Sequence, residues 1–184
     1  MHQLNRNSGT SLKNYKLLIV DDHEIVIDGI RSVLDDVPQI SIVGSALNGT
    51  EALDLTGKLQ PDVILMDINM PGMNGIEACK KIKKYYPEKK VLALTQFNEK
   101  RLIKLILKNG ASGYVLKDAC REEILDAIQT VCEGGQSIPT NSPPDIFEKP
   151  LKVSKYNPLF PELSDREKEV LHLISEEYNT QEIA

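Results

Sequence analysis

Residues 63–75 read VILMDINMPGMNG, an apolar run that ends in an aspartate and continues into a loop containing Gly and Pro. A short, continuously apolar run of this kind is typical of a strand buried on both faces of a sheet. Four similar runs occupy residues 16–20, 40–44, 91–94 and 113–116. The stretch around residue 67 therefore predicts one strand of a five-stranded sheet.

The segments between these runs show helical spacing. Val26, Ile30 and Val33 recur at i, i+4 and i+7, and Gly110 and Gly134 stand where helix C-caps are expected. Strands that alternate with helices predict an α/β fold, a doubly wound parallel sheet with helices on both faces. Ligands bind such sheets at the carboxyl ends of the strands.

Polar residues stand at the ends of four predicted strands: Asp21 and Asp22, Asp67, Thr95 and Lys117. Any one of them has a structural explanation, since Asp is a common helix N-cap. Three carboxylates gathered in one crevice repel, because a pair 4 Å apart costs roughly 4 kcal/mol at an effective dielectric constant near 20. Lys117 offsets only one of these charges, so the cluster predicts a divalent cation, and Mg²⁺ suits an open site of oxygen ligands.

A metal ion, a lysine and a hydroxyl are the groups that phosphoryl transfer requires. Asp67 is the predicted nucleophile, because aspartate can form an acyl phosphate, and Lys117 and Thr95 would stabilise the phosphoryl oxygens. Asn69, two residues further on, cannot act as a general acid or base. This favours a switch that holds its phosphoryl group over an enzyme that turns over.

Four stretches, LLIVDDHEIV, DVILMDINMPGMNGIEA, VLALT and GASGYVLKDA, closely resemble the receiver domain of two-component response regulators, over about residues 15–138. The resemblance implies a sheet of order 2-1-3-4-5 with Asp67 as the phosphoacceptor. It also implies Mg²⁺ bound by Asp22, Asp67 and the main-chain carbonyl of Asn69, with Asp21 acting mostly through water.

In this family Thr95 and Lys117 match the switch hydroxyl and the lysine that pairs with phosphate. Tyr114 matches an aromatic switch that turns inward when Thr95 moves toward the phosphoryl group. Taken alone, Tyr114 reads as a half-buried strand aromatic. His23 is expected at a helix start, outside the site. Gln96 and Phe97 are expected to govern access to the phosphate.

The C-terminal part reads as a separate unit. Residues 139–161 hold six of the ten prolines and are interpreted as a linker, and residues 163–184, LSDREKEVLHLISEEYNTQEIA, resemble the start of a LuxR-type helix-turn-helix domain. Together these signatures indicate the NarL/FixJ class. The predicted organisation is a tail (1–14), a receiver (15–138), a linker (139–161) and a truncated DNA-binding domain (162–184) whose recognition helix would follow residue 184.

The composition agrees with a soluble, cytoplasmic protein. Of 184 residues, 41% are hydrophobic and 27% charged, which excludes wholesale disorder, and the net charge of -5 disfavours electrostatic binding of nucleic acid by this stretch. The three cysteines form no CxxC pair, so we expect reduced thiols. The polar N-terminus carries no export signal, and no apolar run reaches the roughly 20 residues of a membrane helix.

The leading hypothesis is a response regulator in which a sensor histidine kinase phosphorylates Asp67. The shifted receiver would then form a homodimer or release the DNA-binding domain, with DNA bound only by the full-length protein and no membrane involved. The alternative is a stand-alone interaction module without DNA-binding output. An aspartyl phosphatase is opposed by Asn69, and a flavin-binding domain by the sequence Asp22-His-Glu where a phosphate loop would stand.

Overall fold

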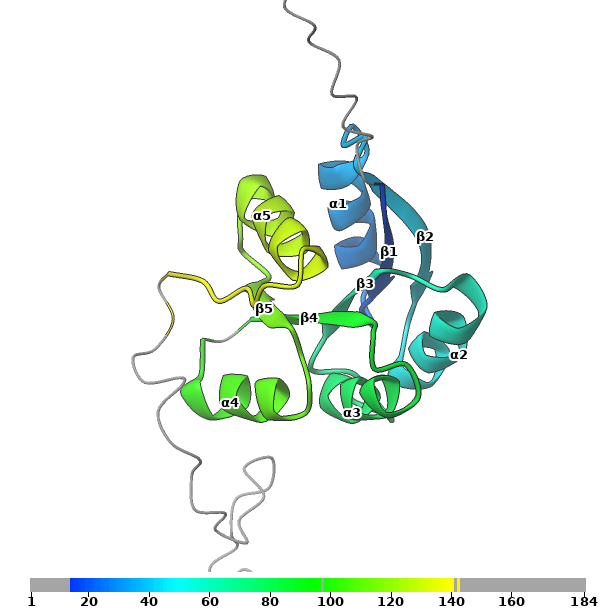
Figure 1. Ribbon diagram of the computed structural model, residues 1–184, viewed down its shortest axis with the longest axis vertical. Coiled ribbons are helices and arrows are strands. Elements are labelled where there is room, and N and C mark those ends of the chain that lie inside the picture. The colour runs from blue at the N-terminus through cyan, green and yellow to red at the C-terminus, as the bar shows by residue number, and fades with distance from the viewer. Residues whose placement is uncertain (1–13, 97, 141, 143–184) are drawn as a thin grey trace, which may run out of the picture. The chain divides into compact units, whose positions relative to one another are not determined.

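The computed structural model describes residues 14–96, 98–140 and 142, in which strands and helices alternate along the chain (Figure 1). The strands are β1 (Tyr15–Val20), β2 (Ile40–Ala46), β3 (Val63–Asp67), β4 (Lys90–Thr95) and β5 (Gly113–Leu116). The helices are α1 (Glu24–Leu34), α2 (Gly49–Leu59), α3 (Gly75–Tyr85), α4 (Lys100–Lys108) and α5 (Arg121–Cys132).

The strands form one parallel sheet of order β2-β1-β3-β4-β5, which confirms the predicted fold. All five predicted apolar runs lie within strands, and β2 continues beyond its predicted end to Ala46. Strand β3 lies in the middle of the sheet, and every one of its residues is buried. Its continuous apolar sequence reflects this position, because both of its faces are covered.

Helices α1 and α5 cover one face of the sheet, and α2, α3 and α4 cover the other (Figure 1). Successive strand residues point to opposite faces, so Ile64 packs with the second group and Leu65 with the first. The face of α1 that packs inward is formed by Ile27, Ile30 and Leu34, one residue later than two of the three predicted positions.

The strand register aligns the carboxyl ends of four strands. Val20 pairs with Met66, and Asp67 pairs with Leu94. Thr95 pairs with Leu116, and the backbone N–H of Lys117 donates to the Thr95 carbonyl at 2.8 Å. The residue that follows each apolar run is therefore brought to the same edge of the sheet.

Several predicted regions lie outside the described residues: most of the N-terminal tail (1–13), Phe97, most of the linker and all of residues 162–184. Within the part of the chain that the structure describes, no helix is both long enough and apolar enough to span a membrane.

Candidate functional site

Lys117 joins two buried aspartates at the carboxyl edge of the sheet. Its Nζ lies 2.7 Å from Asp21 Oδ2 and 3.0 Å from Asp67 Oδ2. Asp21 is 0% exposed and Asp67 is 3% exposed, while 14% of the Lys117 side chain reaches solvent. Three strands thus deliver one cation and two carboxylates to one crevice, as the sequence predicted.

Asp21, Asp67 and Lys117 form a triad in which burial and charge act in opposite directions on the pKa values of Asp67 and Lys117. Burial raises the pKa of Asp67 against the opposing effect of Lys117, and the nearby Asp21 charge raises it further. Burial alone would lower the pKa of Lys117, but its close contacts with Asp21 and Asp67 outweigh burial and raise that pKa. Lys117 therefore stays charged, and one ammonium serves two carboxylates.

Asp22 and His23 stand beside the triad. The Asp21, Asp22 and His23 side chains form a group whose possible ligand atoms lie within 4.8 Å of one another. His23 Nδ1 is 3.2 Å from Asp21 Oδ1 and 3.0 Å from Asp22 Oδ1, although His23 is 63% exposed. His23 also stands at the N-cap of α1, as predicted, but the expectation that it would lie outside the site is wrong.

The donor set fits a hard divalent cation. Asp22 Oδ1 and Asp21 Oδ2 are buried and make no aligned hydrogen bond within the described residues, so only ion-pair contacts meet their charge. Carboxylate oxygens in an open, partly solvated arrangement are the ligands that Mg²⁺ prefers. The explanation of Asp22 as a helix cap does not hold, because His23 occupies that position.

The loop after β3 folds back onto Asp67. The N–H of Asn69 donates to Asp67 Oδ1 at 3.3 Å, and the N–H of Gly75 donates to the Ile68 carbonyl at 2.9 Å. A Cβ on Gly75 would lie 2.0 Å from the Asp67 carbonyl oxygen, so only glycine permits this closure. Asn69 is exposed at the mouth of the site, and Gly72 turns the loop with φ +72°.

The two predicted switch residues are both buried. Thr95 is 0% exposed at the end of β4, in the strand next to Asp67, and Gln96 is exposed directly after it. Tyr114 is 0% exposed rather than half-buried, and its hydroxyl lies 2.8 Å from Asn98 Oδ1 and 2.6 Å from Ser142 Oγ. Sequence reasoning missed both partners, because their contacts with Tyr114 arise only in the folded chain.

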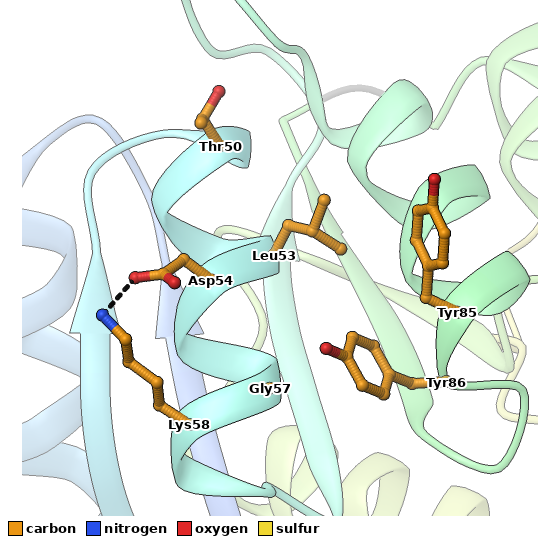
Figure 2. A pocket seen from close by; sticks show the side chains of 7 residues that line it. All are labelled: Thr50, Leu53, Asp54, Gly57, Lys58, Tyr85 and Tyr86. Carbon is orange, nitrogen blue, oxygen red and sulfur yellow. Dashed lines mark hydrogen bonds and ion pairs between the residues drawn. The ribbon is translucent and has the colours of Figure 1, made fainter.

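A second concavity lies between α2 and α3 and has a volume of about 550 Å³ (Figure 2). Its only ion pair among the residues drawn joins Lys58 Nζ and Asp54 Oδ2 at 2.7 Å, and both side chains are more than half exposed. Its lining residues are Thr50, Leu53, Asp54, Gly57, Lys58, Tyr85 and Tyr86. No residue predicted for the site belongs to this set, and its charged groups are solvated, so it does not compete with the strand-end crevice.

A parallel sheet of this order, with paired aspartates after β1, an aspartate at the end of β3 and a lysine after β5, defines a receiver domain. The chain belongs to the response regulator receiver family, whose domain model matches residues 17–129. The family resemblance of the four sequence stretches is thereby confirmed.

The chain is similar to the transcriptional regulatory protein LnrK of Bacillus subtilis (strain 168), with 39% identity over 178 aligned positions; the match covers 92% of this chain and 80% of LnrK. The receiver domain of the response regulator NarL from Mycobacterium tuberculosis matches with a TM-score of 0.64 and 31% identity, over 66% of this chain and 98% of that domain.

A structure of two RcsB dimers bound to two parallel DNAs matches with a TM-score of 0.67 and 29% identity, over 94% of this chain and 82% of RcsB. The relatives are two-component response regulators of the LuxR/NarL group, as predicted, and are signalling proteins rather than conventional enzymes.

Proposed function

We propose that Asp67 accepts a phosphoryl group from a phosphohistidine of a sensor histidine kinase. The observation that carries this assignment is the pair of contacts from Lys117 Nζ to Asp67 and Asp21. Without a ligand, a lysine shared by two buried carboxylates leaves one negative charge unbalanced. A site that already holds a cation beside a buried nucleophile suits a reaction that adds a dianion.

In the transfer step, the bond from phosphorus to the histidine nitrogen breaks as a bond forms from phosphorus to a carboxylate oxygen of Asp67. The contact with Lys117 favours the ionised form of Asp67 and so opposes burial, which raises the pKa of Asp67. Lys117 then pairs with a phosphoryl oxygen, and the Thr95 hydroxyl hydrogen-bonds another. Asn69 supplies neither an acid nor a base for hydrolysis, so the acyl phosphate persists.

Mg²⁺ would be held by Asp22, Asp67 and the main-chain carbonyl of Asn69, with Asp21 acting mostly through water. When bound, the ion supplies positive charge that neutralises the phosphoryl oxygens. Two observations support this assignment: the buried Asp22 Oδ1 makes no aligned hydrogen bond within the described residues, and Lys117 is shared by two carboxylates.

The output is proposed to be a change in dimerisation and DNA binding, by a regulator that acts in the cytoplasm. The likeness to RcsB, whose dimers bind DNA, supports this output. Phosphorylation would draw Thr95 toward the site and stabilise the inward position of Tyr114, and the altered surface would favour a homodimer. Residues 162–184 are proposed to begin the DNA-binding domain of the full-length protein, after a linker at 139–161.

The test is intact mass after incubation with Mg²⁺ and acetyl phosphate. We expect one added phosphoryl group in the wild type and none in Asp67→Asn. Asp54→Asn is the matched control, because Asp54 is an exposed aspartate on α2. A phosphoryl group gained by Asp67→Asn would refute the assignment, as would loss of the modification in Asp54→Asn alone.

A further inference from the structure

The segment after α5 returns along the outer edge of the sheet. The N–H of Ser137 donates to the Ser112 carbonyl at 3.1 Å, and the N–H of Tyr114 donates to the Ser137 carbonyl at 3.0 Å. Ser137 and Gly113 form a parallel bridge at the edge of β5. A Cβ on Gly113 would lie 2.2 Å from the Ser137 carbonyl oxygen, so glycine is required for this approach.

The same segment continues to the hydroxyl of Tyr114. The Ser142 hydroxyl donates to the Pro139 carbonyl, and the N–H of Ser142 donates to the same oxygen at 3.0 Å. Because the Ser142 proton is used in this way, Ser142 Oγ serves as the acceptor for Tyr114 at 2.6 Å. A tight turn thus presents one serine oxygen to a phenol that is otherwise enclosed by the core.

Tyr114 also lies within reach of the loop that leads from Thr95 to α4. Its hydroxyl is 2.8 Å from Asn98 Oδ1, and Asn98 stands three residues after Thr95. A phenol has a single proton, so the two acceptors share or compete for it. Burial raises the pKa of Tyr114, which keeps that proton in place. Tyr114 therefore connects the loop beside the phosphoacceptor with the segment that leaves the receiver.

We propose that Ser142 is a positioning residue: its hydroxyl holds Tyr114 in the inward position and so couples phosphorylation of Asp67 to the docking of Ser142 on Tyr114 and of Ser137 on the edge of β5. The inference rests on the proposed function of Asp67. The inward position of the Tyr114 ring is proposed to favour the phosphorylated receiver. Because coupling between two equilibria is reciprocal, phosphorylation must then favour the contact between Tyr114 and Ser142 to the same degree.

The first experiment follows the rate of phosphorylation by acetyl phosphate with Mg²⁺, read by intact mass. Removing one hydrogen bond that stabilises the competent position lowers the rate about two- to tenfold in Ser142→Ala. Ser137→Ala is the control, because it keeps the main-chain bonds that Ser137 makes, and it retains the wild-type rate. In the Tyr114→Phe background, Ser142→Ala has no additional effect, since the shared bond is already absent.

The second experiment measures amide hydrogen exchange of the peptide that contains residues 137–142, with and without beryllium fluoride and Mg²⁺. The wild type gains protection on adding beryllium fluoride, and both Ser142→Ala and Tyr114→Phe lose that gain. A residue that only stabilised the fold would lower protection equally in both conditions.

Three outcomes would overturn the proposal or its basis. A wild-type rate together with a wild-type gain of protection in Ser142→Ala would refute the role of Ser142 alone. Additive effects of Ser142→Ala and Tyr114→Phe would show that Ser142 acts by another route. A wild type that gains no phosphoryl group would refute the proposed function of Asp67, and this inference with it. If Ser142→Ala does not fold, Ser142→Gly, which also lacks the hydroxyl, takes its place in both experiments.

Discussion

At the carboxyl edge of the sheet, a layer of apolar side chains is followed by a layer of charged side chains, and the two layers are buried to a similar degree. Val20, Met66 and Leu94 are at most 2% exposed, and the residues that follow the first two, Asp21 and Asp67, are at most 3% exposed. The apolar layer stabilises the fold, since a fully buried aliphatic side chain contributes about 1.5–3 kcal/mol. The charged layer carries a desolvation cost that its mutual attraction does not fully offset.

This contrast shows what each layer is for. Apolar residues in the positions of Asp21, Asp67 and Lys117 would extend the core of β1, β3 and β5 and make the protein more stable. The chain instead concentrates unbalanced charge at one edge of the sheet, where a metal ion and a phosphoryl group can balance it. Substitutions in the apolar layer and in the charged layer should therefore differ in how they affect the free energy of unfolding and the phosphorylation of Asp67.

The largest loss of stability is expected on the apolar side. Leu65→Ala empties a position that is 0% exposed in the central strand and should lower the free energy of unfolding by about 4 kcal/mol, from lost burial and the cavity left behind. Urea denaturation measures the change. At low temperature the variant should still gain a phosphoryl group from acetyl phosphate. A loss below about 1 kcal/mol would mean that the core repacks freely, contrary to close packing.

A somewhat smaller loss is expected for Lys117→Met in Mg²⁺-free buffer. Removing one partner of a buried pair costs roughly 3–5 kcal/mol, and we expect the lower end because Lys117 keeps some contact with solvent. The loss should shrink on adding Mg²⁺, and also as the pH falls and Asp67, whose pKa burial raises, becomes protonated. Phosphorylation should be lost at every pH.

The control for this variant is Lys58→Met, which removes an exposed i,i+4 pair with Asp54 on α2. Exposed pairs of this kind contribute about 0.3–0.5 kcal/mol, so the variant should remain close to wild type. Equal losses in the two lysine variants would contradict the electrostatic account of the site.

The sequence alone predicts the fold and the strand-end cluster because both depend on local pattern. Apolar runs followed by Asp67 or Lys117 identify strand ends, and the parallel topology then brings these ends together. What the sequence cannot provide is side-chain placement across distant segments. His23 turns into the acidic group because Asp21 Oδ1 accepts its backbone N–H at 3.0 Å, and Ser142 meets Tyr114 across a separation of 28 residues.

Gly75→Ala tests how closely the loop after β3 is fitted to the phosphoacceptor. The added methyl would overlap the Asp67 carbonyl oxygen, so the loop must shift at a cost of about 2 kcal/mol. Because Asn69 moves with the loop, phosphorylation should slow as well. Gly29→Ala is the control: Gly29 lies in α1 with no atom within 4 Å of an added Cβ, and alanine there should stabilise the helix by about 0.5–1 kcal/mol. Equal stability changes in the two variants would mean that the loop after β3 does not need glycine at position 75.

The smallest effect is expected for Asp67→Asn, and its sign is opposite to that of the other variants at the site. Burial raises the pKa of Asp67 in the folded state, so ionised Asp67 destabilises the protein at pH values above its unfolded pKa of about 3.9, and this cost disappears below that value. The amide variant should therefore melt a few degrees higher than wild type at pH 7 without Mg²⁺. The difference should fade as the pH approaches 4, and also as Mg²⁺ is added to the wild type.

Asp54→Asn on the surface of α2 should show no such gain. A gain that is independent of both pH and Mg²⁺ would mean that the buried charge of Asp67 is not its source, and the boundary between the two layers would then have to be explained by packing alone.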